Sequence, residues 1–237
     1  MSDSVPVTTV LFDLDDTLFD HAGTARAALA ATAAERPALH GVPLETLYQR
    51  YSELLEELHP LVMTGQLTYL AAREQRFARL LAPYEPAAEA ADVAARHYAH
   101  YQQQRRPVAG ALALLQRLRP TCKIGIVTNN RTAEQQQKLR FLGLASLVDA
   151  LITSEQVGVL KPDPAIYAVA LARLGASPAE TVMVGDNWTA DVLGALAVGI
   201  RPVWLNRFGA ARPLPHVAEL ASLEPMEEVL NLLVGHS

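Results

Sequence analysis

Close to its N-terminus the chain carries the stretch Val10-Leu11-Phe12-Asp13-Leu14-Asp15-Asp16-Thr17-Leu18. A short apolar run ends there in three carboxylates and a hydroxyl, and short bounded runs of this kind are typical of buried strands. We therefore predict a strand over Thr8–Asp13 that delivers Asp13 and Asp15 at its carboxyl end. Ligands of open α/β sheets bind at that end of the strands, so a site is expected at this edge.

Three aspartates so close together repel one another. At about 4 Å and an effective dielectric near 20, each pair costs roughly 4 kcal/mol, so a nearby cation would stabilise the cluster. Oxygen ligands without thiolates favour a hard cation, Mg²⁺ before Ca²⁺. Taken alone, the Asp-x-Asp-x-Thr pattern is explained as well by an ordinary acidic turn, since a short motif is only a hypothesis.

The composition limits the classes of function. The chain has 237 residues, half of them hydrophobic, enough for one large domain or for a core with an insert. Its net charge of -5 argues against polymeric nucleic acid as a partner, whereas a small anionic substrate needs only a local positive site. The single cysteine, Cys122, excludes an intrachain disulfide and is typical of a reducing compartment. We interpret Cys122 as structural.

Targeting signals are not expected. The N-terminus lacks a basic region, and no apolar run approaches the roughly 18 residues of a membrane span. We therefore expect a cytoplasmic protein without membrane contact, either a monomer or a homodimer.

Between about Phe19 and Arg105 the strand-like runs disappear and good helix formers dominate. Leucines and tyrosines between 44 and 58 recur on one helical face, and Pro43 is placed to begin that helix. Further helices are expected at about 21–36, 68–82 and 87–104, separated by the breakers Pro37, Gly41, Pro60, Gly65, Pro83 and Pro86. His97 and His100 are expected at the surface. The pattern predicts an all-helical domain, residues 19–105, inserted between residues 1–18 and 106–237.

After Pro107 strands and helices alternate. Strands are expected at 123–128, 150–153, 181–185 and 202–205, and helices at 111–118, 132–142, 164–174, 189–198 and 225–234. This alternation predicts an α/β fold with a doubly wound parallel sheet. The strands are apolar without clean alternation, as expected when both faces of a sheet are covered.

Polar residues also follow the later strands, namely Thr128-Asn129-Asn130, Lys161, Gly185-Asp186 and Asp191. Because parallel strands place their carboxyl ends at one edge, we expect these side chains to converge with Asp13 and Asp15. Each has an ordinary alternative when taken alone: a strand-to-helix turn, a solvated lysine, a helix cap or an acid favoured by the helix dipole. The ordered series at strand ends favours a site for metal and phosphate.

The chain resembles the phosphatases of the haloacid dehalogenase (HAD) superfamily that carry a helical cap after the first strand. The resemblance covers nearly the whole length and rests on four motifs: Asp13-x-Asp15-x-Thr17, Thr128, Lys161-Pro162 and Gly185-Asp186-x-x-x-x-Asp191. Residues 12–20, 185–187 and 204–207 are also similar to the branch of pyrimidine 5'-nucleotidases and acylneuraminate-9-phosphatases. The resemblance to the superfamily implies a Rossmann-like catalytic core, residues 1–18 and 106–237, and a cap, residues 19–105.

The resemblance implies that Asp13 is the nucleophile and becomes an aspartyl-phosphate. The chemistry agrees, since a carboxylate can split phosphoryl transfer into two easier steps. Asp15 then corresponds to the general acid, which protonates the leaving oxygen and later activates water. Thr17 is expected to help orient Asp15.

The same resemblance implies a Mg²⁺ site formed by the Asp13 side chain, the Asp15 backbone carbonyl and Asp186, with Asp191 supporting or completing it. A second set of residues is expected to hold the phosphoryl oxygens, where transition-state charge is stabilised. This set comprises Thr128, the Asn129 backbone amide and Lys161.

The expected activity is Mg²⁺-dependent hydrolysis of a small phosphorylated metabolite, a nucleoside monophosphate or a sugar phosphate. A phosphotransferase or mutase is an alternative, weakened because Asp16 stands where sugar-phosphate mutases of the superfamily often have Gly. Haloacid dehalogenation is weaker, since those enzymes generally lack the acid found here as Asp15. A phospho-acceptor switch is a further alternative, but the receiver domains it resembles are much shorter and lack an insert.

Overall fold

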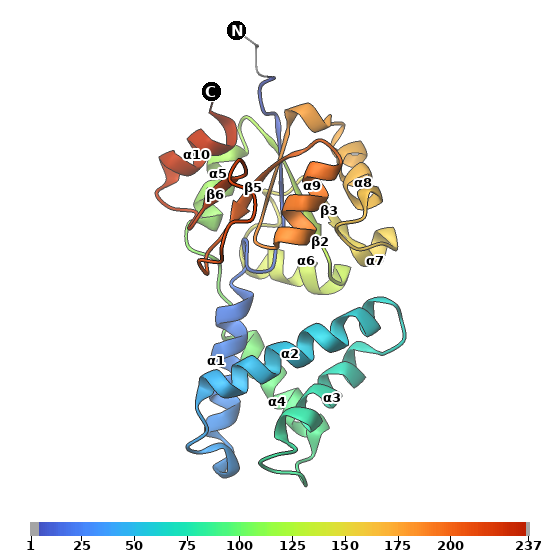
Figure 1. Cartoon of the computed structure of the whole chain (residues 1–237), viewed down its shortest axis with the longest axis vertical. Helices are drawn as coiled ribbons and strands as arrows, with labels where there is room; N and C mark the ends of the chain where they lie inside the picture. Colours follow the sequence, from blue (N-terminus) through green and yellow to red (C-terminus); the bar gives the residue numbers. More distant parts are fainter. Residues whose placement is uncertain (1–4, 236–237) are drawn as a thin grey trace. The chain divides into compact units, whose positions relative to one another are not determined.

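The computed structural model describes residues 5–235 of the chain. These residues form two compact units (Figure 1). One unit contains the described residues up to Asp20 together with those from Pro107 onward, and the other is His21–Arg106. Among the described residues, no helix has both the length and the hydrophobicity that crossing a membrane requires.

The first unit is built on a parallel sheet of six strands in the order β3-β2-β1-β4-β5-β6. The strands are β1 Thr9–Phe12, β2 Lys123–Thr128, β3 Ala150–Thr153, β4 Thr181–Gly185, β5 Arg201–Leu205 and β6 Ala218–Leu220. The doubly wound α/β fold predicted from the sequence is confirmed. Strand β6, the outermost strand on its side, was not expected, because three residues are too few to show a periodic pattern.

Helices cover both faces of this sheet (Figure 1). They are α5 Ala111–Leu118, α6 Thr132–Phe141, α7 Ser154–Val157, α8 Pro164–Leu174, α9 Gly194–Ala197 and α10 Met226–Val234. Leu11 of β1 belongs to a buried cluster with Tyr167 of α8 and Ala195 of α9. Its neighbours Val10 and Phe12 are also fully buried and point to the opposite face, because successive strand residues alternate. Burial on both faces explains the continuous apolar sequence of β1.

The helix predicted over 189–198 is wrong in its regularity. Residues Trp188–Leu193 form a π-helix, and only Gly194–Ala197 is α-helical. The Tyr167 hydroxyl donates a hydrogen bond to the Ala190 carbonyl, and a group inserted in this way interrupts the regular ladder of a helix. A Cβ at position 194 would overlap the Tyr167 ring, so the glycine there makes this insertion sterically feasible.

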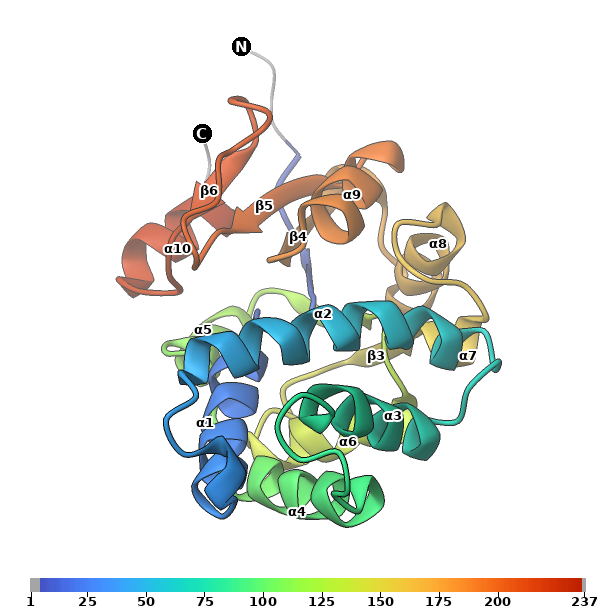
Figure 2. The same ribbon diagram turned by 60° about the horizontal axis from the view of Figure 1, so that its bottom comes forward.

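The second unit consists of four α-helices, α1 His21–Ala34, α2 Leu44–Met63, α3 Tyr69–Leu81 and α4 Ala90–Gln103 (Figure 2). Helices α1 and α4 pack together, as do α2 with α3 and α3 with α4. Pro60 was expected to separate helices, but α2 continues through it to Met63. Thr64 caps the end of the helix, because its backbone amide and its hydroxyl both donate to the Pro60 carbonyl, at 3.0 Å and 2.9 Å.

His97 is not at the surface, contrary to the expectation from sequence. It is 5% exposed, and its ring centroid lies 5.2 Å from that of Tyr51 and 4.8 Å from that of Phe77. Burial, assisted by the positive charges of Arg76 and Arg73, lowers the pKa of His97 to about 3. His97 is therefore a neutral core residue of the helical unit.

Candidate active site

The predicted residues of the first unit meet at one edge of the sheet. Strand β1 pairs with β2 on one side and with β4 on the other, so their carboxyl ends are adjacent. Lys161 brings the loop between α7 and α8 to the same place, because its Nζ lies 2.7 Å from Asp13 Oδ1 and 2.6 Å from Asp191 Oδ1. Side chains 30 and 148 positions apart in the chain are thus in direct contact.

Asp13, Asp186 and Asp191 form a carboxylate cluster in which one oxygen of each residue lies within 4.8 Å of an oxygen of each of the other two. We call this the Asp triad. One ammonium group, that of Lys161, pairs with two of its members. When all four groups are ionised, the cluster keeps an excess of two negative charges. Three carboxylate ligands with this excess fit a hard divalent cation.

Burial shifts the pKa values of the carboxyl groups and of the lysine in opposite directions. It raises the pKa of Asp13 to about 7, although Lys161 acts against the change. Burial likewise raises the pKa of Asp186, and the charges of Asp13 and Asp191 add to it. Burial alone would lower the pKa of Lys161, but the two facing carboxylates outweigh it and raise the pKa. The lysine stays charged, but its single positive charge does not compensate the three carboxylates. A bound cation would supply the missing positive charge.

Hydrogen bonds from neighbouring residues hold the Asp triad. The Thr17 hydroxyl donates to Asp186 Oδ1 at 3.2 Å, and the Trp204 indole N–H donates to the Asp186 carbonyl at 2.8 Å. The Asn187 amide donates to Asp191 Oδ2 at 3.0 Å. Thr17 therefore acts on the Asp triad, and its expected role in orienting Asp15 stays a prediction.

The backbone of Lys161 is fixed by the Asn129 side chain. The side-chain nitrogen Nδ2 of Asn129 donates to the Lys161 backbone carbonyl at 2.9 Å, and Oδ1 of Asn129 accepts from the Lys161 backbone N–H at 2.6 Å. Two opposed hydrogen bonds at one residue leave the lysine backbone little freedom. Asn129 was predicted to contribute its backbone amide to phosphate binding, and the structure adds this second role for its side chain.

The Asp15 carboxylate contacts Asn130 and also two residues, Gln135 and Lys138, that were not predicted from the sequence. Lys138 Nζ lies 2.5 Å from its Oδ1, and the side-chain amides of Gln135 and Asn130 donate to its Oδ2 at 3.0 Å and 3.2 Å. Gln135 also donates to the hydroxyl of Thr128 at 2.7 Å. The spacing of Gln135, Lys138 and Leu139 on one helical face was the available signal, since all three are buried.

The loop after β5 supports the turn that follows Asp15, a contact that was not predicted from the sequence. Asp16 has a φ of 58°, in the left-handed region that aspartate tolerates better than most residues. Arg207, in the loop after β5, donates to the Asp16 carbonyl at 3.2 Å and to Asp20 Oδ1 at 2.9 Å. Arg207 thereby stabilises a strained turn at Asp16, between the predicted site residues Asp15 and Thr17.

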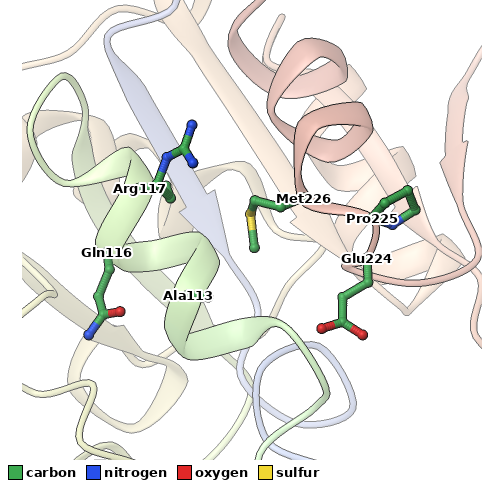
Figure 3. A pocket seen from close by; sticks show the side chains of 6 residues that line it. All are labelled: Ala113, Gln116, Arg117, Glu224, Pro225 and Met226. Carbon is green, nitrogen blue, oxygen red and sulfur yellow. The ribbon is translucent and has the colours of Figure 1, made fainter.

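A cavity of about 480 Å³ lies elsewhere, between α5 and the start of α10 (Figure 3). Its lining residues are Ala113, Gln116, Arg117, Glu224, Pro225 and Met226. None of the predicted site residues lines it. The candidate site is the edge with the clustered charges, because carboxyl groups whose pKa is strongly raised gather at functional sites.

Comparison with known proteins shows the family to which the chain belongs. A family model described as haloacid dehalogenase-like hydrolase matches residues 7–199. The chain belongs to the haloacid dehalogenase-like hydrolase family. Membership of this family and relatives named as phosphatases identify the chain as a hydrolase.

Two curated relatives show the kind of enzyme to which the chain is similar. Pyrimidine 5'-nucleotidase YjjG of Escherichia coli is 37% identical over 131 residues, which cover 55% of this chain and 58% of the relative. That match therefore spans less than two thirds of the relative. Glyceraldehyde 3-phosphate phosphatase of Pyrococcus abyssi is 34% identical over 203 residues, 84% of this chain and 82% of the relative.

Solved structures agree on the fold. The magnesium-bound HAD-hydrolase YfnB of Bacillus subtilis superimposes with a TM-score of 0.76 at 25% identity, covering 96% of this chain and all of that one. A 2-haloacid dehalogenase of Pseudomonas syringae superimposes with a TM-score of 0.62 at 31% identity, covering 95% and 99%. Relatives with different reactions share this fold, so the site must decide which reaction is favoured.

Proposed function

We propose that the protein hydrolyses small phosphate monoesters, with Asp13 as the nucleophile. The observation that carries the proposal is the contact of Lys161 with Asp13, a member of the Asp triad. It joins a buried carboxylate to a cation able to hold a phosphoryl oxygen. Relatives named as phosphatases of glyceraldehyde 3-phosphate, ribulose-1,5-bisphosphate and phosphoserine support this reaction class. A sugar phosphate or a nucleoside monophosphate is the proposed substrate.

The proposed reaction has two steps. In the first, an oxygen of Asp13 forms a bond to phosphorus while the ester oxygen leaves with a proton from Asp15. In the second, Asp15 takes a proton from water, which attacks phosphorus and releases Asp13 and inorganic phosphate. Thr128, the Asn129 amide and Lys161 are proposed to bind the phosphoryl oxygens, whose charge they stabilise.

We propose that the Asp triad, with the Asp15 backbone carbonyl, holds Mg²⁺. When bound, the ion would neutralise the excess charge of the triad and of the phosphoryl group. Carboxylate and carbonyl oxygens are the ligands that Mg²⁺ prefers, and the donor set contains neither thiolate nor imidazole. We further propose that the two units are the catalytic core and the inserted cap.

Removal of divalent metal is expected to abolish turnover. Protein dialysed against EDTA should hydrolyse 4-nitrophenyl phosphate at less than about 1% of its initial rate, because the phosphoryl charge then faces uncompensated carboxylates. A screen of phosphorylated metabolites with and without added MgCl₂ measures this and identifies the substrate. Full activity in EDTA would contradict the metal assignment and leave the phosphatase assignment in place.

Gly185→Ala is expected to weaken metal binding. A Cβ at position 185 would overlap the Asp191 carboxylate, so the carboxylate must move. Disturbing a metal ligand in this way typically costs about 10–100-fold in affinity. Isothermal titration of the EDTA-treated protein with MgCl₂ measures the effect.

Gly199→Ala is the matched control for this prediction. Gly199 has a φ of +76°, and its nearest neighbour for a Cβ is Pro178, at 3.7 Å. The alanine there strains the backbone by about 1–2 kcal/mol without touching the Asp triad. Equal Mg²⁺ affinities of the two variants would show that Gly185 has no special role beside Asp191.

Two other reactions are tested by their products. A phosphotransferase would pass the phosphoryl group to a sugar hydroxyl, so its product formed in ¹⁸O-labelled water would be unlabelled, whereas hydrolysis would label the inorganic phosphate. The resemblance in fold to a 2-haloacid dehalogenase is tested by chloride release from 2-chloropropionate. Multiple turnovers of a phosphate ester would exclude a phospho-acceptor switch, which instead predicts a stable stoichiometric phospho-form.

A further inference from the structure

Helix α6 carries two buried polar side chains that the two proposed steps do not use. Gln135 is fully buried and Lys138 is 1% exposed, although glutamine and lysine are seldom buried to this extent. They lie three residues apart, on the same face of the helix. Both reach Asp15, the residue proposed to transfer the proton.

The contacts of Gln135 fix the orientation of its amide. Nε2 donates one hydrogen to Asp15 Oδ2 at 3.0 Å and the other to Thr128 Oγ1 at 2.7 Å. The reversed amide would turn its oxygen toward a carboxylate, which accepts hydrogen bonds and cannot donate when ionised. The Gln135 Oε1 atom has no hydrogen-bond partner within the described residues. The two N–H groups therefore determine how this side chain is placed.

Gln135 also determines where the Thr128 hydroxyl proton points. A hydroxyl has one proton and two acceptor positions. Because Gln135 donates to the Thr128 oxygen, the Thr128 proton is directed elsewhere and can be donated to a bound phosphoryl oxygen. One side chain thus orients a phosphate ligand and the proton-transfer residue together.

Lys138 fixes the other oxygen of Asp15. Its ammonium lies 2.5 Å from Asp15 Oδ1, 3.9 Å from Glu134 Oε1 and 4.9 Å from the centre of the Phe19 ring. With Gln135 and Asn130 on Oδ2, both carboxylate oxygens are held. Catalytic groups act efficiently only when such contacts lock their position.

We propose that Gln135 and Lys138 are positioning residues for proton transfer by Asp15. This inference rests on the proposed function, in which Asp15 protonates the leaving oxygen. Loss of either residue lets the Asp15 carboxylate move away from that oxygen. The loss should therefore matter most for esters whose leaving group needs the proton.

Two aryl phosphates of similar shape test this. Phenolate is a poor leaving group and 4-nitrophenolate a good one, so only phenyl phosphate depends strongly on the general acid. General acid catalysis contributes about 100–10,000-fold. We expect Gln135→Met and Lys138→Met to lower kcat/KM for phenyl phosphate at least about tenfold more than for 4-nitrophenyl phosphate. The quantity kcat/KM is used because it reports the steps up to departure of the leaving group.

Matched controls lie on the exposed side of the same helix. Gln136 and Arg140 are exposed, and Gln136→Met and Arg140→Met should leave the ratio of the two kcat/KM values at its wild-type level. If a methionine variant at 135 or 138 fails to fold, Gln135→Asn or Lys138→Gln replaces it, with the same expected change because each shortens the reach to Asp15.

Equal loss on both substrates in folded variants would overturn the inference and leave the proposed function standing. Retained turnover in Asp13→Asn would overturn both, because the leaving-group experiment presupposes attack by Asp13. A selective loss on phenyl phosphate, together with an inactive Asp13→Asn, supports the positioning role. A purely structural role for Gln135 and Lys138 predicts no such selectivity.

Discussion

Asp13→Asn should lower the turnover of 4-nitrophenyl phosphate by more than about 1,000-fold, which corresponds to about 4 kcal/mol of transition-state stabilisation. The amide is nearly the same size as the carboxylate but is a far weaker nucleophile, so the aspartyl-phosphate cannot form. Initial rates at saturating substrate and Mg²⁺ measure the loss. Acid-quenched wild-type protein should carry one phosphoryl group by mass spectrometry, and the variant none.

The fold of this variant should be preserved. The pKa of Asp13 is already raised to about 7 by burial, so a neutral side chain at this position is tolerated, and Lys161 keeps its contact with Asp191. Asp163→Asn is the matched control: Asp163 is exposed and caps α8, where asparagine caps equally well. Wild-type rates in Asp13→Asn would refute its assignment as nucleophile, whereas wild-type rates are expected in Asp163→Asn.

The sheet and the convergence at its edge could be predicted because both follow from local patterns. Apolar runs ending in Asp13, Thr128 and Asp186 define strands, and parallel strands bring their ends together regardless of distance along the chain. Lys161 could be added because it falls in the same ordered series.

What could not be predicted depends on tertiary contacts. Lys138 has the sequence context of a solvated helix lysine, and only the packing of α6 beside Asp15 explains its burial. His97 is buried by Tyr51 and Phe77, which come from two other helices. The π-helix at 188–193 results from the Tyr167 hydroxyl of α8. Single-segment periodicity carries no information about such partners from distant segments.

Lys161→Met should strongly destabilise the first unit in the absence of divalent metal. The substitution removes the cation shared by Asp13 and Asp191, and breaking a buried ion pair in this way costs about 3–5 kcal/mol. Both tryptophans, Trp188 and Trp204, belong to this unit. Their fluorescence during urea unfolding in EDTA therefore reports its free energy of unfolding separately from that of the helical unit.

The pH dependence of this loss follows from the direction of the pKa shift. The pKa of Asp13 is raised from 3.8 to about 7 even with Lys161 present. Between these two pH values, folded metal-free protein therefore binds more protons than unfolded protein. Asp13 therefore destabilises the fold as pH rises from 4 to 7. Lys161 holds the pKa of Asp13 down, so loss of Lys161 should extend this fall to higher pH. Lys123, whose ammonium donates to the Leu174 carbonyl at 2.6 Å, is the control. Lys123→Met should cost no more than about 1.5 kcal/mol, without the added pH dependence. Equal pH profiles for the two variants would contradict the view that Lys161 compensates the charge of the Asp triad.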